Sequence, residues 1–321
     1  MSKKQPLISV VICTHNRVDL LYDVLQTLII QTLESNFFEI IVIDNNSTDE
    51  TRTAVEKFYN LFPNLRYYFE TNIGLAYARN RGWQEAHGQY IAYTDDDCKI
   101  PAQWLSTAKA TIEKSAPLIF GGPYFAFYKS PKPIWFKDEY GSRELGTTAR
   151  VLQQHEYLSG GNLFINRQLL EKLDGFPTHL GMAGQRIAYG EETGLQMRFR
   201  ELFPDQVIYY EPALYVYHLV RTEKLTIPWL ARAFFHKGQY VYVTTSAKTS
   251  QPVNKVSFAL SATKTVISAA GDCLYGIVRR DRKQYPYFQN YLYEHTSRYL
   301  RTLGKLYAQY QERIESAKLS T

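Results

Sequence analysis

The chain has 321 residues, of which 45% are hydrophobic and 21% are charged, and its formal net charge is +6. This balance is typical of a globular protein, and it excludes a disordered chain, a collagen-like repeat and a small disulfide-stapled scaffold. A length near 300 residues predicts two domains or one large domain.

Two further features concern the compartment. The three cysteines, at positions 13, 98 and 273, have no metal-ligand spacing, which predicts free thiols in a reducing environment. The first residues, MSKKQPLISVVICTHNR, lack the long apolar run and the small-residue cleavage site of a signal peptide. We therefore expect a cytoplasmic protein.

Charge is distributed unevenly along the chain. Residues 221–321 contain 16 Lys and Arg against 6 Asp and Glu, a net charge of +10, whereas residues 1–220 carry −4. An acidic body followed by a basic tail indicates that the tail contacts something anionic.

The first 120 residues alternate between apolar runs and amphipathic stretches. Apolar runs at 7–13, 38–43, 65–69 and 90–93 predict four strands, the first of them buried on both faces. Helical spacing of apolar residues predicts helices over 18–30 and 76–86, and Ser47 to Glu50 has the pattern of a capping box that opens another helix. This alternation predicts an α/β fold with a doubly wound, mostly parallel sheet.

The pattern changes after residue 120. Residues 121–161 are rich in aromatic side chains and are interrupted by prolines, which predicts a long functional loop. Helices are expected over 167–172 and 192–202, and a late strand over 213–218. Beyond residue 221 the chain is expected to be mainly helical, with breaks near Gly238, Pro252 and Pro286. We divide it into a domain over 1–226 and a helical, basic, aromatic-rich region over 227–321.

Polar residues follow three of the four predicted strands: Thr14-His15-Asn16, Asp44-Asn45-Asn46 and Asp95-Asp96-Asp97. Open α/β sheets bind ligands beyond the carboxyl ends of their strands, so these residues are the first candidates for a site. A Gly-rich phosphate loop does not follow the first strand, which excludes a dinucleotide fingerprint or a P-loop.

The three consecutive acids would repel a phosphate if they faced it directly. They suit a hard divalent cation held between carboxylates and phosphate oxygens. The alternative is a solvated turn or a helix start, since Pro101 follows and acids are favoured in a first helical turn.

Six motifs occur in a fixed order: ISVVICTHNR, IVIDNNSTDET, NIGLAYARNRGWQEAHGQYIAYTDDDC, SGGNLFINRQLLEKLDGF, YGEETGLQMRFR and VYHLVRTEKLT. In this order they resemble a family 2 glycosyltransferase with the GT-A fold, over about Ile8 to about Thr226. The resemblance implies a nucleotide-diphospho-sugar donor, a hydroxyl acceptor such as a glycan or a lipid-linked glycan, and inversion at the anomeric carbon.

The resemblance also implies which residues bind the donor. Thr14, His15, Asn16 and Asp44 match positions that hold the base and ribose, and a carboxylate suits the N3–H donor of uracil. Four further residues are expected near the donor: Arg79, Asp95, Asp96 and Gly161.

Metal binding is implied for Asp95 and Asp97, with manganese or magnesium bridging the two phosphates of the donor. His218 ends the late strand, where the GT-A core often has a histidine that approaches the metal. A single histidine in an aromatic strand is otherwise a packing residue.

The general base is implied at Glu191-Glu192, where the family usually has Glu-Asp. An acid at a helix start near the donor sugar can deprotonate the acceptor hydroxyl. We favour Glu192, which aligns with the Asp, and keep Glu191 as the alternative base or as a group that orients the acceptor. The alternative interpretation is that both acids only stabilise a helix N-terminus and have no catalytic role.

The basic tail combines its cations with many aromatic residues, which suits an anionic membrane surface. Residues 256–278 are not expected to span a membrane, because Lys264 and Asp272 interrupt them. The alternative is a helical subdomain that packs on the catalytic body or on a second subunit. Nucleic-acid binding is not expected, since no recognition motif accompanies the charge. The aromatic residues include Trp229, Phe234, Phe235, Tyr285, Tyr287, Tyr291, Tyr293 and Tyr299.

The sequence thus predicts an inverting, metal-dependent glycosyltransferase with a donor of the UDP-sugar class, acting in cell-surface polysaccharide or glycolipid synthesis. We expect it in the cytoplasm, peripheral at the inner face of the membrane. Two alternatives are a sugar nucleotidyltransferase, which would want a Gly-rich basic loop after the first strand, and a non-catalytic sugar-nucleotide-binding scaffold.

Overall fold

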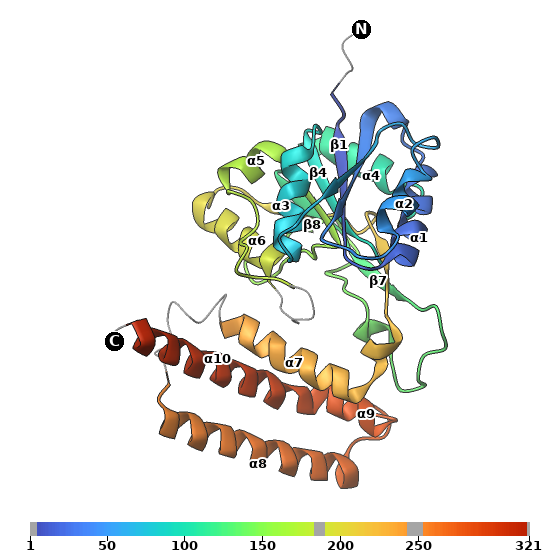
Figure 1. The fold of residues 1–321 in the computed structure, drawn as a ribbon. Coiled ribbons are helices and arrows are strands. Elements are labelled where there is room, and N and C mark those ends of the chain that lie inside the picture. Colours follow the sequence, from blue (N-terminus) through green and yellow to red (C-terminus); the bar gives the residue numbers. More distant parts are fainter. Residues whose placement is uncertain (1–4, 183–189, 243–252, 320–321) are drawn as a thin grey trace. The chain divides into compact units, whose positions relative to one another are not determined.

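The computed structural model describes residues 5–182, 190–242 and 253–319 (Figure 1). The chain forms two compact units. The first unit contains the residues up to Phe127 and most of those from Asp138 to Leu219, and the second contains Tyr128–Lys137 and the residues from Val220 on. The division of the chain at residue 226 stays a prediction.

The first unit is built on a sheet whose eight described strands have the order β3-β2-β1-β4-β9-β6-β10-β8. Four neighbouring strands are parallel, β4 pairs antiparallel with β9, and β9 pairs antiparallel with β6. The prediction of a mostly parallel α/β sheet is confirmed. The bounds are β1 (Ile8–Thr14), β2 (Phe38–Asp44), β3 (Leu65–Phe69), β4 (Tyr90–Asp95), β6 (Ile119–Gly121), β8 (Arg150–Val151), β9 (Asn162–Asn166) and β10 (Ile208–Tyr210).

Helices cover both faces of this sheet, because the central strands are apolar on both sides. Val10 and Ile12 of β1 belong to one core cluster, and Val11 between them belongs to the cluster on the opposite face. All these side chains are fully buried. The helices of this unit are α1 (Val18–Ile29), α2 (Thr51–Glu56), α3 (Leu75–Glu85), α4 (Trp104–Ser115), α5 (Arg167–Lys172) and α6 (Glu191–Leu202), and η1 (Ser35–Phe37) precedes β2.

A second, three-stranded sheet joins distant segments of the first unit. Its order is β5 (Cys98–Lys99), β11 (Val216–Leu219) and β7 (Tyr124–Phe127). His218 on β11 pairs with Cys98 on β5, directly after the three acids. This pairing brings the late strand to the end of β4. The 121–161 segment, expected to be one long loop, begins at the last residue of β6 and contains β7, β8 and the short helix η2 (Asp138–Tyr140).

The capping-box prediction at Ser47–Glu50 is wrong. Helix α2 begins at Thr51 with Glu50 at its N-cap, and it has no side-chain cap hydrogen bond. The Ser47 hydroxyl accepts a hydrogen bond from the Asn16 amide instead, at 2.9 Å, and Asp49 accepts one from the Thr51 amide. Ser47 therefore bonds to a residue just after β1 and does not cap the helix.

The second unit is helical, as predicted. It contains η3 (Thr222–Leu225), α7 (Ile227–Val241), α8 (Lys255–Arg279), α9 (Phe288–Tyr291), the π-helical η5 (Leu292–Thr296) and α10 (Ser297–Leu319). Helix α10 packs against both α7 and α8 (Figure 1). Within the described ranges, no helix combines the length and apolarity needed to cross a membrane.

The helix break predicted near Gly238 is wrong. Gly238 lies inside α7, where a Cβ atom would come within 2.0 Å of the Arg301 carbonyl oxygen on α10. Gly304 on α10 similarly faces the Phe235 carbonyl. The glycines allow two helix backbones to approach closely and do not interrupt the helix. The break predicted near Pro252 lies outside the described residues.

Candidate active site

The carboxyl ends of β1, β2 and β4 meet at one edge of the sheet. In the strand register Thr14 pairs with Asp44, and Cys13 pairs with Asp95. The polar residues that follow these strands are therefore neighbours in space, as expected for a ligand site in an open α/β sheet.

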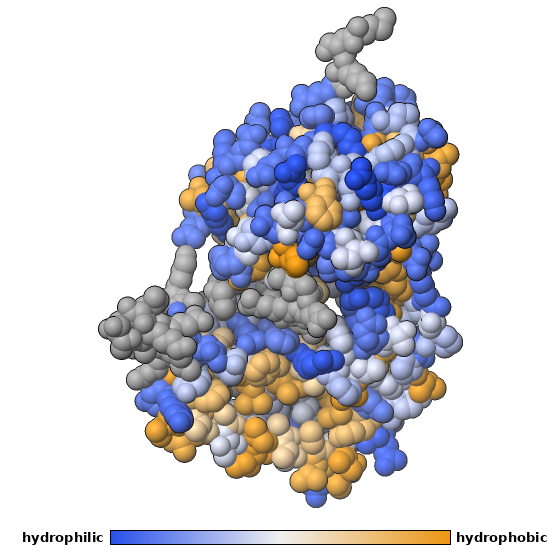
Figure 2. Space-filling model, in the orientation of Figure 1, coloured by the Kyte–Doolittle hydropathy of each residue, from blue (hydrophilic) through white to orange (hydrophobic). Residues whose placement is uncertain are grey.

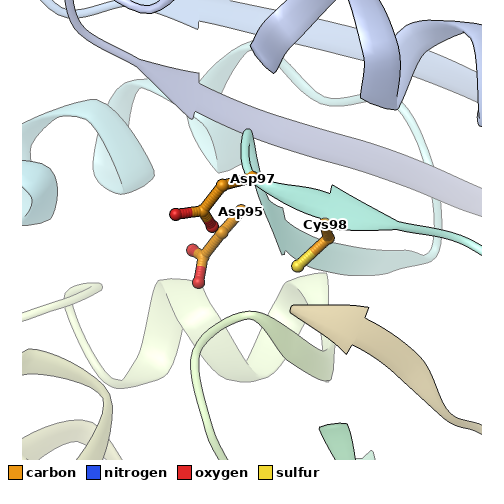
Figure 3. Close-up of side chains that lie close together, drawn as sticks. All are labelled: Asp95, Asp97 and Cys98. Atoms are coloured by element: carbon orange, nitrogen blue, oxygen red, sulfur yellow. The ribbon is translucent and has the colours of Figure 1, made fainter. Parts of the chain in front are cut away.

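Asp95 and Asp97 form the acidic centre of this edge. Their carboxylates and the Cys98 thiol have ligand atoms within 4.8 Å of one another, and Figure 3 shows the two carboxylates side by side after the end of β4. His218 approaches from β11, with its Nε2 3.3 Å from Asp97 Oδ1 and 4.0 Å from Asp95 Oδ2. Two carboxylates beside an imidazole suit a divalent cation.

Cys98 does not fit the same role. Burial, followed by the charges of Asp95 and Asp97, raises the pKa of its thiol well above the usual value. A protonated thiol is a poor ligand, and hard cations prefer oxygen. The side chains that could hold a hard cation here are therefore Asp95 and Asp97, with His218 beside them.

Asp96 points away from this pair. Its carboxylate accepts hydrogen bonds from the Thr14 hydroxyl at 2.8 Å and from Arg17 at 2.9 Å. Burial raises the pKa of Asp96 to about 6, against the opposing charge of Arg17. These contacts join the end of β1 to residues 95–97, which we call the acid loop. Thr14 and Asp96, both expected at the donor, bond to each other, and their contact with a donor stays a prediction.

Arg17 is a site residue that our sequence analysis did not single out. Besides Asp96, it lies 4.0 Å from Asp97. It ends the ICTHNR motif, so a cation directly after the polar strand end was the available signal.

A pocket of about 110 Å³ lies beside these residues. His15 lines it, with Nδ1 2.7 Å from the Asn45 carbonyl, and Asn45 in turn accepts from the Gly74 amide at 2.8 Å. The predicted donor residues Thr14, His15 and Asp96 share this pocket. Its other lining residues are Cys13, Arg17, Asn45, Leu75, Ala78 and Met182.

Asp44 and Asn16 lie next to the pocket and do not line it. Asp44 is buried, and its two oxygens accept hydrogen bonds from the Ser47 amide at 2.8 Å and from the Tyr67 hydroxyl at 2.7 Å. Asn16 adopts a φ of 52° and accepts from the Thr48 amide at 2.7 Å. Both side chains order the loop after β2, and their contact with a nucleotide stays a prediction.

Arg79 on α3 lies between two acids that are distant in the sequence. Its guanidinium is 2.6 Å from Glu191 and 3.5 Å from Asp95, and it stacks over the Phe176 ring. Only 4% of its side chain is exposed. Protein groups surround this buried cation, and its contact with the donor stays a prediction.

Gly160 and Gly161 make room for this cluster. A Cβ atom on Gly160 would lie 2.3 Å from Arg79 Nη2, and one on Gly161 would lie 2.5 Å from Asp95 Oδ2. Gly161 was expected to let the backbone approach the donor sugar. The structure shows Asp95 as a close neighbour of Gly161, and the approach of a donor sugar stays a prediction.

The two glutamates at the start of α6 differ in environment. Glu191 is buried and paired with Arg79, whereas Glu192 is half-buried. Burial raises the pKa of Glu192 to about 8, and the neighbouring charge of Glu191 adds to the increase while Arg79 opposes it. A carboxyl group with a pKa near neutrality is suited to accept a proton.

Residues 9–174, just over half of the chain, match the model of Glycosyl transferase family 2. The chain belongs to glycosyl transferase family 2. The predicted resemblance is confirmed, and Asp95, Asp97, Arg79 and the ends of β1, β2 and β4 fall within the matched residues, whereas Glu191 and His218 lie beyond them.

Curated relatives of this family 2 chain include two proteins of Haloferax volcanii. Glycosyltransferase AglE is 27% identical over 185 residues, which cover 57% of this chain and 60% of the relative. A glucosyl-dolichyl phosphate glucuronosyltransferase is 23% identical, covering 72% and 75%. The succinoglycan biosynthesis protein ExoM of Rhizobium meliloti is 24% identical, covering 72% and 73%. The match thus spans 60% of the length of AglE.

Solved structures share the fold. The mannosyltransferase PcManGT of Pyrobaculum calidifontis, in complex with GDP-Man and Mn²⁺, superposes with a TM-score of 0.61 at 16% identity and covers 97% of this chain and 88% of that one. S. aureus TarS 1–349 with UDP-GlcNAc gives 0.55 at 17% identity, covering 98% and 92%. Because both are transferases of GT-A type, this family 2 chain has the predicted GT-A fold.

Proposed function

We propose that this chain is an inverting, metal-dependent glycosyltransferase that moves a sugar from a nucleotide-diphospho-sugar, a UDP-sugar, to a hydroxyl acceptor. The observation that carries the proposal is the arrangement around Arg79, which joins the acid expected at the metal, Asp95, to the helix that bears the glutamate pair. Arg79 thereby connects the acid proposed to act on the leaving diphosphate with the glutamates proposed to act on the attacking hydroxyl.

The residues for a divalent cation fit that role by their chemistry. Asp95 and Asp97 supply oxygen ligands at a strand end, and His218 lies within 4.0 Å of both. A manganese or magnesium ion there would neutralise the charge that develops on the departing diphosphate. Manganese accompanies the nucleotide sugar in the PcManGT structure, which supports the same role here.

Glu192 is the base in this proposal. It takes the proton of the acceptor hydroxyl, the acceptor oxygen forms a bond to the anomeric carbon, and the bond from that carbon to the diphosphate breaks with its electron pair leaving on the diphosphate. Attack opposite the leaving group inverts the anomeric centre. Glu191 is less available to the acceptor because its carboxylate is engaged by Arg79 at 2.6 Å.

The donor class and the biosynthetic process are inferred from the relatives and the similar structures. TarS was solved with UDP-GlcNAc and PcManGT with GDP-Man, so both nucleotides belong in a test. The names of the relatives include succinoglycan and dolichyl phosphate glycosylation. We place the activity in cell-surface polysaccharide or glycolipid synthesis, on the cytoplasmic side of a membrane that the basic tail contacts.

Turnover of a nucleotide-sugar panel tests the proposal. We expect manganese-dependent hydrolysis of one UDP-sugar, abolished in Glu192→Gln and retained in Glu113→Gln, a change on the exposed side of α4. Binding of UDP with manganese but no hydrolysis or transfer with any donor would favour a non-catalytic binding protein. Release of pyrophosphate from a nucleoside triphosphate and a sugar phosphate would favour a nucleotidyltransferase.

A further inference from the structure

Helix α8 is amphipathic with its larger apolar side chains outward. Of its 25 residues only Gly276 is buried, where its Cα faces the Tyr291 ring. The half-buried residues on the same side are mostly small or polar. They include Ser261, Ala262, Thr265, Ala269, Asp272 and Cys273.

Specific contacts fix this inner side. Asp272 accepts hydrogen bonds from the Tyr291 hydroxyl at 3.1 Å and from the Thr296 hydroxyl at 2.7 Å, and it lies 3.0 Å from His295. A rotation of α8 about its axis would remove the carboxylate from all three partners. The outward direction of the opposite side is therefore set by the packing of the second unit.

The outer side carries a continuous aliphatic stripe. Its five members recur at intervals of four or seven residues, which places them on one face of a helix. Their side chains are between 64% and 76% exposed, and Figure 2 shows hydrophobic residues gathered over this part of the molecule. We call these residues the α8 stripe: Val256, Leu260, Ile267, Leu274 and Val278.

Cations border the α8 stripe. Lys255 and Arg279 stand at the two ends of the helix, Lys264 lies beside the stripe, and Arg282 and Lys283 follow in the next turn, all of them exposed. The acids of the same segment are engaged elsewhere: Asp272 on the inner side, and Asp281 with the amides of 283 and 284. An aliphatic face rimmed by cations is complementary to an anionic lipid surface.

An apolar pocket adjoins the same helix. It has a volume of about 340 Å³ and lies between α7, α8 and α10 within the second unit. Val266, Ala269 and Cys273 of α8 form one wall, and Phe234 and Leu300 are among the residues opposite. Hydrocarbon is the chemistry that such a lining favours.

We propose that the α8 stripe lies flat in the surface of an anionic phospholipid bilayer, with its aliphatic side chains below the headgroups and the bordering cations at the lipid phosphates. The inference deepens the proposed function, because it rests on a membrane location and assigns that contact to one face. It also moves the contact toward aliphatic residues: of the aromatic residues that suit a membrane, Phe234 and Tyr291 are buried, most others are half-buried, and Tyr287 is exposed.

A second copy of the chain is a weaker occupant on the same observations. If the α8 stripes of two copies packed together, Lys264 and the other cations that border the stripe would lie against the same cations of the second copy. Like charges repel, and their desolvation in such an interface would oppose association. Lipid phosphates relieve this repulsion.

Co-sedimentation of the full chain with vesicles tests the proposal. We use vesicles of phosphatidylcholine alone and vesicles of phosphatidylcholine mixed with phosphatidylglycerol, each at low and high salt. We expect binding to the mixed vesicles only, weakened by salt because screening shortens the range of the attraction. Ile267→Asn/Leu274→Asn should lower the affinity by at least about tenfold, since two aliphatic side chains no longer enter the lipid.

Controls separate this result from misfolding and from failure of the proposed function. Ile30→Asn/Leu61→Asn replaces two comparably exposed aliphatic residues of the first unit and should retain vesicle binding. Lys264→Glu/Arg279→Glu should lose the preference for phosphatidylglycerol even if the asparagine pair folds poorly. Binding of UDP with manganese, measured on each variant, reports on the donor site independently of lipid.

Three outcomes would overturn the inference. They are no preference of the unaltered chain for phosphatidylglycerol, equal vesicle binding by both asparagine pairs, and self-association in sedimentation velocity that the α8 pair removes while vesicle binding is absent. The last outcome would make the α8 stripe an interface between copies.

Discussion

The guanidinium of Arg79 lies 2.6 Å from the carboxylate of Glu191, across 112 residues of sequence and in a fully buried setting. This ion pair makes the two neighbouring glutamates chemically different. Glu191 has a cationic partner, whereas Glu192 has the charge of Glu191 beside it and a raised pKa. The pair also anchors α6 to the helix that carries Arg79, and through Arg79 to Asp95.

Removal of the cation should destabilise the protein. Arg79→Met leaves Glu191 buried without a partner, which typically costs about 3–5 kcal/mol of unfolding free energy. We expect this loss in urea unfolding of Arg79→Met, and partial recovery in Arg79→Met/Glu191→Gln. Arg81→Met is the matched control on the same helix: Arg81 is half-buried and pairs with Glu85, which is not buried, so its loss should change stability little. Equal stability of the two single variants would contradict a structural role for the Arg79–Glu191 pair.

The second prediction concerns the base. Glu192→Gln keeps the shape of the side chain but cannot accept the acceptor proton, so kcat should fall by roughly 10²–10⁴. The donor affinity should change little, because Asp95 and Asp97, the acids proposed to bind the metal, are intact. Steady-state kinetics measure both quantities. If Glu191→Gln shows this phenotype and Glu192→Gln does not, the two roles are exchanged.

The raised pKa of Glu192 predicts a pH-dependent stability difference. A folded-state pKa of about 8, against 4.5 for an ordinary glutamate, means that the folded chain holds the proton more tightly than the unfolded chain. The favourable contribution of this carboxyl is therefore present below pH 4.5 and is lost as the pH rises from 4.5 through 8.

Glu192→Gln removes the ionisation and should consequently gain in melting temperature over the unaltered chain as the pH increases through this range. Melting curves at a series of pH values measure the difference, with Glu113→Gln as the control for a surface glutamate. A constant difference between Glu192→Gln and the unaltered chain from pH 5 to pH 8 would show that the pKa of Glu192 is not raised.

Gly161 provides a test of the space around Asp95. A methyl group there would lie 2.5 Å from the Asp95 carboxylate, so Gly161→Ala should displace that ligand and weaken manganese-dependent UDP binding by roughly 10–100-fold. Gly271→Ala is the matched control, because no atom lies within 4 Å of its added methyl group. Unchanged binding in Gly161→Ala would show that the loop adjusts without moving Asp95.

The sequence predicted the elements whose apolar pattern is local. The runs 38–43 and 65–69 fall within β2 and β3 because each strand is a short, largely apolar run that a local window reveals. The acids after β4 were also found, since strand ends in this fold class lie at one edge. Contacts across the fold were not predictable in this way. Arg17 with Asp96 and Arg79 with Glu191 are ion pairs between distant segments, and neither has a periodic signal.

Two errors show how tertiary packing overrides local patterns. Gly238 was expected to end a helix, but the close approach of α10 requires it inside α7. Ser47 was expected to cap a helix, but its hydroxyl accepts a hydrogen bond from the backbone amide of Asn16. In both cases the role of the residue depends on a contact with a segment distant in the sequence. The residues adjacent to it in the sequence do not reveal that contact.

The central claim is that the acid loop binds a divalent cation together with the donor diphosphate. Calorimetric titration of UDP with and without manganese, on the unaltered chain, on Asp97→Ala and on the exposed control Asp205→Ala, tests it most directly. We expect manganese-dependent UDP binding in the unaltered chain and in Asp205→Ala, and its loss in Asp97→Ala with the melting temperature almost unchanged. Equal manganese-dependent affinity in Asp97→Ala, or UDP binding of the unaltered chain that is indifferent to manganese, would contradict the account.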